Sequence, residues 1–388
     1  MSLLRSPGEV TGGRRIAVLD GYRALAILLV LAFHYTVRFA PPLQRHAHFP
    51  AGSIFSGAAP LDYGWAGVEL FFVISGFVIL MTLERCRSVG EFALRRFARL
   101  WPMLVIAASM TSLVVYLIGP PDWRVSWPDY LMSILLIEPS LLSHFWAGAS
   151  FKWVDDAYWS LFVEIRFYAL AAVVYLAAGR NFVRYWLVLQ GVAFAAFLVV
   201  VLTAFRAYPY LSLVLFPDYM PYFTVGICVY ECYSRGPLNK IAAAGAVMAA
   251  GMALFNAYYG LFFAIGGTPH GNAVVNLLIF SLFLLFVIDH PIVRIFASRP
   301  MVRLGQASYS LYLIHQVIGV CIMRVCIGLG VPYLIVLPAT VCAMIASACL
   351  LFYRVEVPIK SWILCCCESK VALFERRLPW LSYTTSGG

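Results

Sequence analysis

Charged residues are scarce in this chain. Asp, Glu, Lys and Arg together make up 12% of its 388 residues, whereas soluble globular domains carry roughly 25%. Apolar residues make up 62%, and the mean hydropathy is +0.85. This composition excludes an ordinary soluble enzyme and predicts a polytopic membrane protein. The net charge of +10 does not indicate nucleic-acid binding, because the basic residues stand in short segments between apolar runs.

Metal-type cysteine spacing, internal repeats and low-complexity linkers are also missing from the sequence. Most of the ten cysteines lie in apolar runs, where a thiol is usually a small buried hydrophobe. Cys365, Cys366 and Cys367 form one run, and three adjacent residues cannot easily ligate one metal, which favours lipidation or no role. We therefore expect no metal site and no bound cofactor. One bundle of spans is expected to use the whole chain, without an appended soluble domain.

The apolar runs predict an all-α bundle of about ten transmembrane helices, because a span needs roughly 20 mostly apolar residues. The expected spans are 22–41, 64–83, 101–119, 158–178, 186–205, 213–234, 240–260, 273–289, 307–328 and 332–353. The segment 129–147 holds Glu138, Pro139 and His144 around a short apolar core. This segment is predicted to be re-entrant or interfacial.

The distribution of basic residues orients the bundle. With the N-terminus in the cytoplasm, most of the 28 Lys and Arg fall on the cytoplasmic side, as the positive-inside rule requires. The C-terminus is then cytoplasmic too. The first span is expected to be retained, since no small-residue cleavage site follows it. We expect a transmembrane domain over 1–354 and a short, partly disordered cytoplasmic tail over 355–388.

The first span carries an ionisable residue near each end. Arg23 and His34 are eleven positions apart, which places them on one helix face about 16 Å apart along the axis. A guanidinium at the cytoplasmic mouth can hold phosphate in bidentate fashion, and a buried neutral imidazole can act as a general base. The pair suits a long donor with an anionic head. The alternative is a snorkelling arginine and a histidine bonded to a neighbouring carbonyl.

Two carboxylates on other spans are expected at the depth of His34. Glu69 lies in the span 64–83 and Glu164 in the span 158–178, each about 8–10 Å below the outer surface by residue counting. A carboxylate beside an imidazole orients the ring and stabilises the imidazolium. We therefore expect His34 and Glu164 to be catalytic and Glu69 to support the site. The alternative for each carboxylate is a structural hydrogen bond between spans.

Hydroxyl groups flank these carboxylates. Ser160 and Tyr168 stand one turn before and after Glu164, and either position a hydroxyl acceptor or join neighbouring helices. Ser75, in VISGFV, is not a nucleophile elbow, because Val73 rather than glycine stands two positions before it. Ser75 is expected either to support the site or to allow close helix packing together with its neighbouring glycine.

A basic cluster precedes the expected third span. Arg95, Arg96 and Arg99 lie just inside the membrane, and Pro102 is expected to open the span. The cluster is either a topology signal or a grip on phosphates beside the arginine of the first span. His315 is expected away from the layer of the catalytic histidine, in a structural or channel-lining role.

Six segments, taken in order, resemble the integral-membrane acyltransferase 3 family. They are LDGYRALAILLVLAFHY, GVELFFVISGFVI, RRFARLWP, WSLFVEIRFY, SYSLYLIHQ and VEVP. The resemblance implies about ten spans and O-acylation of carbohydrates or other hydroxyl compounds, typically from acetyl-CoA. It implies that His34 is catalytic with Arg23 as its partner, that Arg96 and Arg99 match the basic motif, and that Glu164 matches the acidic position. The chain departs from many members at Gln316, and the SGNH-type esterase domain of some members is not expected.

The expected function is O-acyl transfer, with acetyl preferred, from acyl-CoA to a hydroxyl of a cell-surface or exported carbohydrate such as an exopolysaccharide. The expected location is the bacterial inner membrane, with multiple spans. Expected partners are acyl-CoA, the carbohydrate acceptor, membrane lipid and a protein of a polysaccharide pathway, but no nucleic acid. A transporter with a His/Glu proton relay stays open as an alternative, as does a membrane-bound O-acyltransferase that acts on lipid or protein.

Overall fold

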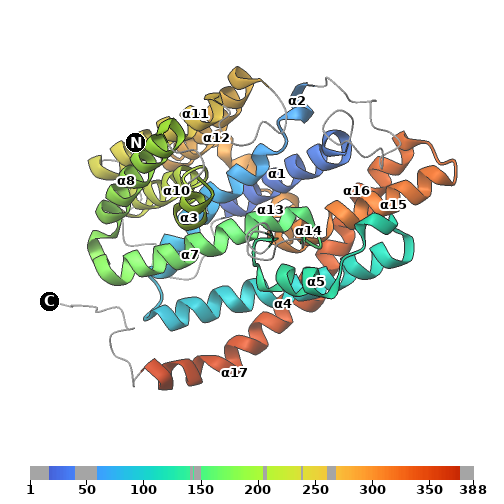
Figure 1. Cartoon of the computed structure of the whole chain (residues 1–388). Helices are drawn as coiled ribbons and strands as arrows, with labels where there is room; N and C mark the ends of the chain where they lie inside the picture. Colours follow the sequence, from blue (N-terminus) through green and yellow to red (C-terminus); the bar gives the residue numbers. More distant parts are fainter. Residues whose placement is uncertain are drawn as a thin grey trace.

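The computed structural model describes residues 17–39, 59–139, 143, 150–203, 208–236, 239–259 and 268–375 of the chain, and these residues form helices and no strand (Figure 1). The long helices are α1 (Ala17–Phe33), α3 (Ala66–Leu83), α4 (Val89–Ile118), α7 (Trp159–Ala178), α8 (Phe182–Thr203), α10 (Met220–Arg235), α11 (Lys240–Tyr259), α12 (Pro269–Val287), α15 (Gln316–Gly328), α16 (Tyr333–Leu351) and α17 (Val357–Glu375). Shorter pieces connect them: α2 (Ala59–Asp62), α5 (Trp127–Leu135), α9 (Tyr208–Leu215), α13 (Arg299–Gln306) and α14 (Ser308–Ile314), and the single turns and π-helical or 3-10 segments η2 (His34–Arg38), η3 (Pro121–Trp123), η4 (Asp156–Tyr158), η5 (Gly179–Asn181), η7 (Pro291–Ala297) and η8 (Phe352–Glu356).

The predicted all-α membrane bundle is confirmed. The described residues hold eight helical stretches long and apolar enough to cross a membrane, or up to nine if α14 and α15, bent by 57°, count as one span. The sequence predicts about ten. The stretch 156–203 counts once in the structure but contains both α7 and α8, which turn at Gly179 with φ of 51°. Glycine adopts this left-handed φ without a steric penalty, so the expected spans 158–178 and 186–205 each correspond to a helix.

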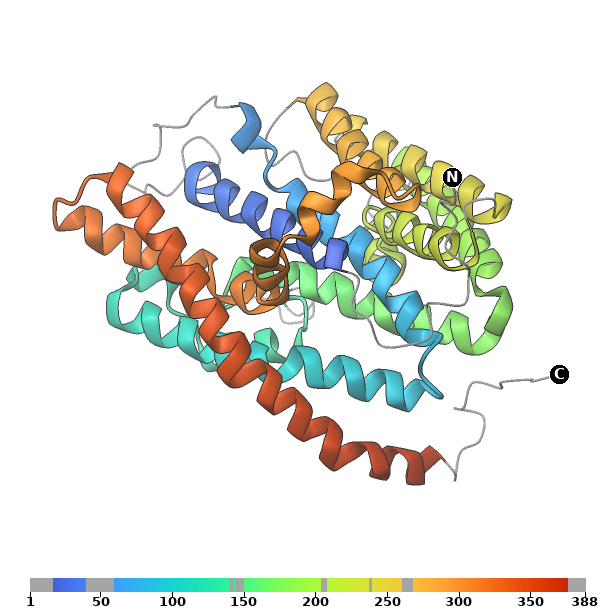
Figure 2. The same ribbon diagram turned by 180° about the vertical axis from the view of Figure 1, so that it is seen from behind.

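Two stretches outside the spans expected from the sequence have defined structure. Helix α5, of nine residues, is about 14 Å long and too short to cross a bilayer, and 140–142 and 144–147 lie outside the described residues. In the expected tail, α17 continues from α16 as one long rod that runs alongside α4 (Figure 2). Residues 376–388, the predicted disordered end, lie outside the described part of the chain.

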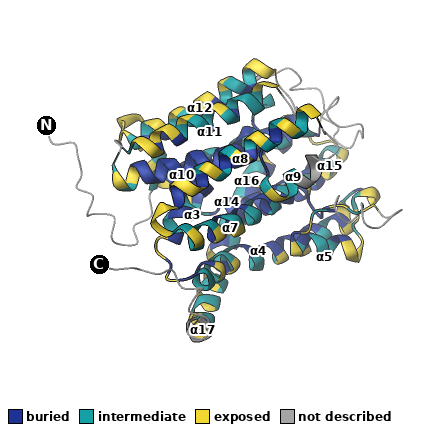
Figure 3. Ribbon diagram, turned by 60° about the vertical axis from the view of Figure 1, so that its left-hand side comes forward, coloured by how far each residue is buried: buried dark blue, intermediate teal, exposed yellow. Residues whose placement is uncertain are grey.

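Helices α3 and α10 form the centre of the bundle. The share of buried residues in the apolar stretch is 78% for α3 and 72% for the span that contains α10, against 22% for α11 and 28% for α12. Figure 3 shows the exposed residues on the peripheral helices. Glycines permit the close contact, since a Cβ at Gly76 would lie 2.0 Å from Phe223 O and one at Gly226 would lie 1.9 Å from Val73 O. Small residues let helix backbones approach in this way in membranes, so the expected packing role of the glycine after Ser75 is confirmed.

Helix α4 departs from the predicted boundary. It begins at Val89, where Ser88 Oγ accepts a hydrogen bond from Glu91 N at 3.1 Å, and it runs through Pro102 without ending. The prediction that Pro102 opens a span at about 101 is therefore wrong. An internal proline is tolerated in membrane helices that pack against neighbouring helices, and α14 packs against α4 at this level, where Tyr309 OH donates to Leu100 O at 2.7 Å.

Candidate active site

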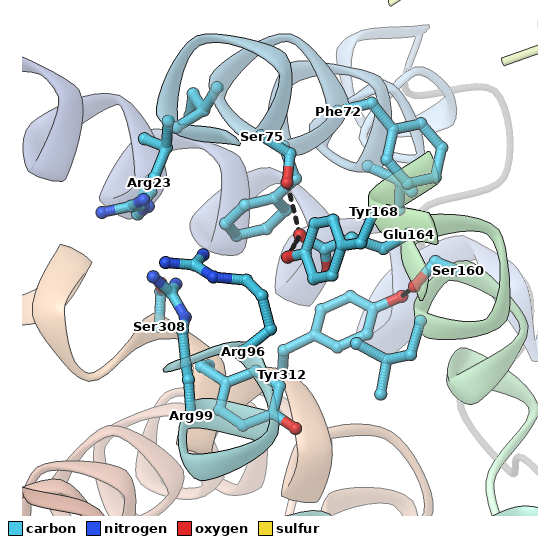
Figure 4. Close-up of a pocket in the computed structure, with 16 residues that line it drawn as sticks. Arg23, Phe72, Ser75, Arg96, Arg99, Ser160, Glu164, Tyr168, Ser308 and Tyr312 are labelled. Carbon is cyan, nitrogen blue, oxygen red and sulfur yellow. Dashed lines mark hydrogen bonds between the residues drawn. The ribbon is translucent and has the colours of Figure 1, made fainter. Parts of the chain in front are cut away.

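A pocket of about 60 Å³ lies between α1, α3, α4, α7 and α14. Seven of the predicted site residues line it, namely Arg23, Ser75, Arg96, Arg99, Ser160, Glu164 and Tyr168. The guanidinium groups gather on one side of the pocket, and Ser160 and Phe72 lie on the other (Figure 4). The described lining residues do not include His34 or Glu69. We call the arginine side of the site the arginine end.

The arginines differ in their partners. Arg23 Nη1 lies 2.8 Å from Oδ1 of Asp20, which is itself buried. Arg96 Nη2 donates to Thr82 Oγ1 at 3.3 Å. Arg99 makes no ion pair with any residue that the structure describes. Arg95, the third member of the predicted cluster, pairs with Glu91 at 2.8 Å and with Glu368 of α17 at 3.3 Å. Its ion pairs therefore lie outside the pocket.

Glu164 is the acidic residue that lines the pocket at the arginine end. Ser75 Oγ and Tyr168 OH both donate to Glu164 Oε1 (Figure 4). Arg96 and Arg99 are close enough to interact electrostatically with this carboxylate. The carboxylate therefore offsets part of the arginine charge and is held by hydroxyl groups from two helices.

The predicted common layer of His34, Glu69 and Glu164 is wrong. Glu164 bonds to Ser75, which lies six residues, or about 9 Å, along α3 from Glu69. Helices α1 and α3 run antiparallel, since a Cβ at Gly67 would meet Ala26 O at 2.3 Å and one at Gly64 would meet Leu29 O at 2.4 Å. Ser75 and Glu164 thus lie at the level of the start of α1. Residue counting failed because helices begin at different heights and tilt.

Glu69 lies in the helix interface instead of the pocket. Tyr222 OH donates to Glu69 Oε1 at 2.6 Å across the contact between α3 and α10. Its side chain is buried, and Asn276 of α12 lies close by. These contacts are those of a structural hydrogen bond between spans, which is the alternative that the sequence left open.

His34 and His315 form a pair at the other end of α1, which we call the histidine end. His34 begins η2, a π-helical segment, and its Nδ1 lies 2.8 Å from Val30 O and 3.4 Å from His315 Nε2. The ring centroids are 4.9 Å apart. The prediction that His315 lies away from His34 is wrong, because the 57° bend between α14 and α15 falls at His315 and redirects its side chain.

The expected bond between Glu164 and His34 is not formed either. In the part of the chain that the structure describes, the hydrogen-bond partners of His34 are Val30 O and His315, while Glu164 accepts from Ser75 and Tyr168. The described hydrogen-bond partners of the imidazole are therefore a backbone carbonyl and a second imidazole, with no carboxylate among them.

Tyr312 connects the pocket to the histidine pair. It lines the pocket, its hydroxyl lies 2.7 Å from Ser160 Oγ, and it donates to Ala157 O at 2.9 Å. On its other side its ring centroid is 5.6 Å from that of His315 and 6.0 Å from that of Phe71. Ser160 thus joins neighbouring helices, one of its two predicted roles. The ring of Tyr312 thus contacts both the pocket and the histidine end.

Sequence reasoning missed three residues around the arginine end. Tyr309 and Tyr312 line the pocket from α14. Glu356, in the π-helical segment η8, accepts a hydrogen bond from Ser310 Oγ at 2.7 Å and interacts electrostatically with Arg99. The segments SYSLYLIHQ and VEVP contain these residues, but their spacing alone gives no sign that they meet.

Asp155, which precedes the apolar stretch 156–203, fixes the segment after His315. Its two carboxyl oxygens accept from Ala157 N at 2.9 Å and from Val317 N at 3.1 Å. Burial raises the pKa of Asp155 to about 7, while these two backbone donors oppose the rise. Because Val317 stands at the start of α15, this acid caps the helix that follows the bend.

The sequence matches the model of a family described as an acyltransferase domain over residues 16–353. It is similar to Acyltransferase MdmB of Streptomyces mycarofaciens, with 27% identity over 198 residues, which are 49% of this chain and 47% of that protein. The match therefore spans about half the length of that relative. The chain is also similar to Protein 2 in the picA locus of Rhizobium radiobacter, with 30% identity over 168 residues, 39% of this chain and 78% of that protein. No solved structure matches.

Proposed function

The chain belongs to the acyltransferase family whose model it matches over residues 16–353, and from that premise we propose that it is an O-acyltransferase. It moves an acyl group, preferentially acetyl, from acyl-CoA to a hydroxyl of a cell-surface or exported carbohydrate. One observation carries the proposal: a pocket with three arginines is joined through Tyr312 to a histidine pair. The first part suits an anionic donor and the second suits proton transfer from a hydroxyl.

The arginine end would bind the phosphates of acyl-CoA. Arg99 has no ion-pair partner among the described residues, and Arg96 and Arg23 lie beside it at the pocket. Guanidinium groups bind phosphate oxygens in bidentate fashion. The pocket of about 60 Å³ holds only a few water molecules, so the pantetheine arm would have to displace the ring of Tyr312 to reach the histidine pair.

His34 would act as the general base. Its Nε2 removes the proton of the acceptor hydroxyl, and the oxygen attacks the thioester carbonyl carbon. The bond from that carbon to sulfur breaks, and the thiolate of CoA takes the proton back from the His34 imidazolium. The products are the ester and free CoA thiol, and His34 returns to its neutral form.

The orientation of the site follows from its substrates. Acyl-CoA is a cytoplasmic donor, so the arginine end would face the cytoplasm, in agreement with the charge distribution of the sequence. The histidine end would then face the other side, where an exported carbohydrate is accessible. We place the protein in the bacterial inner membrane on these grounds.

The test compares the purified wild type with His34→Ala, each checked for monodispersity, and follows release of CoA thiol from acetyl-CoA with a panel of surface-polysaccharide fragments. Acceptor-dependent release that is abolished in His34→Ala is expected, with His270→Ala as the matched control because His270 lies far along the sequence in an exposed helix start. Full transfer by a well-folded His34→Ala would contradict the proposal. So would a wild type that moves protons or solute across liposomes without consuming acyl-CoA.

A further inference from the structure

We propose that His315 is a positioning residue that fixes the reactive tautomer of His34 and stabilises its protonated form. The inference rests on the proposed role of His34 as the general base. His315 is fully buried and touches no reacting atom in this arrangement; it acts through the ring of His34, whose Nδ1 lies 3.4 Å from its Nε2.

The proton positions follow from the fixed acceptors. His315 Nδ1 lies 2.8 Å from Tyr312 O, and a carbonyl oxygen can only accept, so Nδ1 of His315 carries the hydrogen. In the neutral ring, Nε2 of His315 then bears a lone pair, and this lone pair faces His34 Nδ1. His34 Nδ1 also faces Val30 O at 2.8 Å. With two acceptors around Nδ1, the proton of His34 belongs there.

This arrangement leaves Nε2 of His34 as the basic atom. When that atom takes a proton from the acceptor, the Nδ1–H of the imidazolium keeps both acceptors, Val30 O and His315 Nε2. A triad carboxylate performs the same service in serine hydrolases, but a carboxylate is costly to bury in a membrane bundle. The neutral ring of His315 stabilises the imidazolium less and avoids that cost.

The bend between α14 and α15 holds His315 in place. Tyr35 OH donates to His315 O at 2.6 Å, and Gly319 N donates to the same oxygen at 3.1 Å. A side chain at Gly319 would collide with the Tyr35 ring, since its Cβ would lie 2.1 Å from Tyr35 OH. Tyr333 OH in turn donates to Tyr35 O at 2.6 Å. These contacts fix the backbone on which the His315 ring is mounted.

The other titratable groups near the pair do not compete for His34. Arg38 lies one turn further along η2, with Asp156 at 3.8 Å. Asp155 is engaged by backbone N–H groups. Tyr35 and Tyr312 direct their hydroxyls to carbonyl oxygens or to Ser160. Among the described side chains, His315 is thus the hydrogen-bond partner of His34.

Two amide substitutions test the roles of the two ring nitrogens of His315 separately. His315→Asn places an amide near the position of Nδ1, so it keeps the contact with Tyr312 O but offers nothing to His34. His315→Gln extends an amide oxygen to the position of Nε2 and restores an acceptor. We expect kcat of His315→Asn to fall about 10- to 100-fold, while the KM for acyl-CoA stays within about twofold. The acidic limb of the pH profile of kcat/KM should move to lower pH, because the imidazolium of His34 is then less stabilised. His315→Gln should regain most of kcat and the original limb.

The outcomes distinguish a failure of this inference from a failure of the proposed function. Equal losses in both amide variants with an unmoved acidic limb would show a packing role and overturn the inference, as would an Asn variant with wild-type kinetics. If His34→Ala is inactive in either case, the proposed function stands. If His34→Ala is active, both fail.

A measurement on the wild-type protein covers the case in which a variant does not fold. ¹⁵N-histidine NMR of the full chain, with the His34 signals assigned by their loss in His34→Gln, reports the tautomer directly. We expect the hydrogen on Nδ1 of His34. A predominant Nε2–H form would overturn the inference.

Discussion

The two ends of the site hold their polar groups in different ways. At the arginine end, charges are arranged against one another: Arg23 pairs with Asp20, and Arg96 and Arg99 lie near Glu164. At the histidine end, the two imidazoles form hydrogen bonds with backbone carbonyl oxygens and with each other. A charged end can hold an anionic donor firmly, whereas hydrogen-bond partners without charge can keep an imidazole neutral and ready to accept a proton. Under the proposed function, the arginine end binds the donor and the histidine end carries out the proton transfer.

A π-helical segment stands at each end. Segment η2 follows α1 directly and begins with His34. Segment η8 follows α16 directly and ends with Glu356. Such segments widen one helical turn and are frequent at functional sites. Both reach the same neighbour, the bent pair of α14 and α15: His34 contacts His315, and Glu356 accepts from Ser310. The bent pair therefore connects the arginine end to the histidine end.

Removing the base while keeping its bulk should have the largest effect. His34→Gln is expected to lower kcat about 10²- to 10⁴-fold, because general-base catalysis contributes that much, and to leave the KM for acyl-CoA within about twofold. Steady-state CoA release measures both constants, with His270→Gln as the matched control. A rise in KM with an unchanged kcat would show that the histidine end binds the donor, and the comparison between the ends would fail.

Removing a donor contact at the arginine end should affect binding and spare chemistry. Arg99→Met is expected to raise the KM for acyl-CoA about 10- to 100-fold, since a hydrogen bond to a charged group is worth about 1.5–3 kcal/mol, with kcat close to the wild type. The KM should also lose part of its dependence on salt. Arg294→Met, at an exposed position, is the control. An unchanged KM would place the phosphates elsewhere.

Glu164 tests whether the two ends are separate. Because its carboxylate bonds to Ser75 and Tyr168 rather than to His34, Glu164→Gln should lower kcat less than about tenfold. It should also lower the KM for the anionic donor, since less negative charge then faces the arginines. The same CoA-release assay decides the matter. A fall in kcat as large as that of His34→Gln would restore the role that the sequence predicts for this acid.

The three arginines of the arginine end could be predicted from the sequence, whereas the position of Glu164 beside them could not. Arg23, Arg96, Arg99 and Glu164 stand at span ends or inside spans, where ionisable groups are costly and gather around sites. The pocket brings these four together. Glu356 could not be assigned, because its segment VEVP gives no sign of a partner on another helix.

The histidine end could be predicted only in part. His34 is evident because it breaks an apolar run, but its neighbours depend on where helices bend and at what height they begin. Counting residues along straight spans placed Glu164 beside His34 and His315 apart from it, and the structure has the reverse. A 57° bend without a proline at its centre leaves no clear mark in a single sequence.

The smallest expected effect concerns the support of the bend. Tyr35→Phe removes the hydrogen bond from Tyr35 OH to His315 O, while that oxygen keeps its bond from Gly319 N. We expect a loss of about 1 kcal/mol in stability and a fall in kcat of less than about threefold, measured by thermal unfolding in detergent and by CoA release. Tyr353→Phe, at an exposed position, should change neither. If Tyr35→Phe instead matched His315→Asn in kcat and in the acidic limb, the bend itself, more than the lone pair of His315, would set the reactivity of His34.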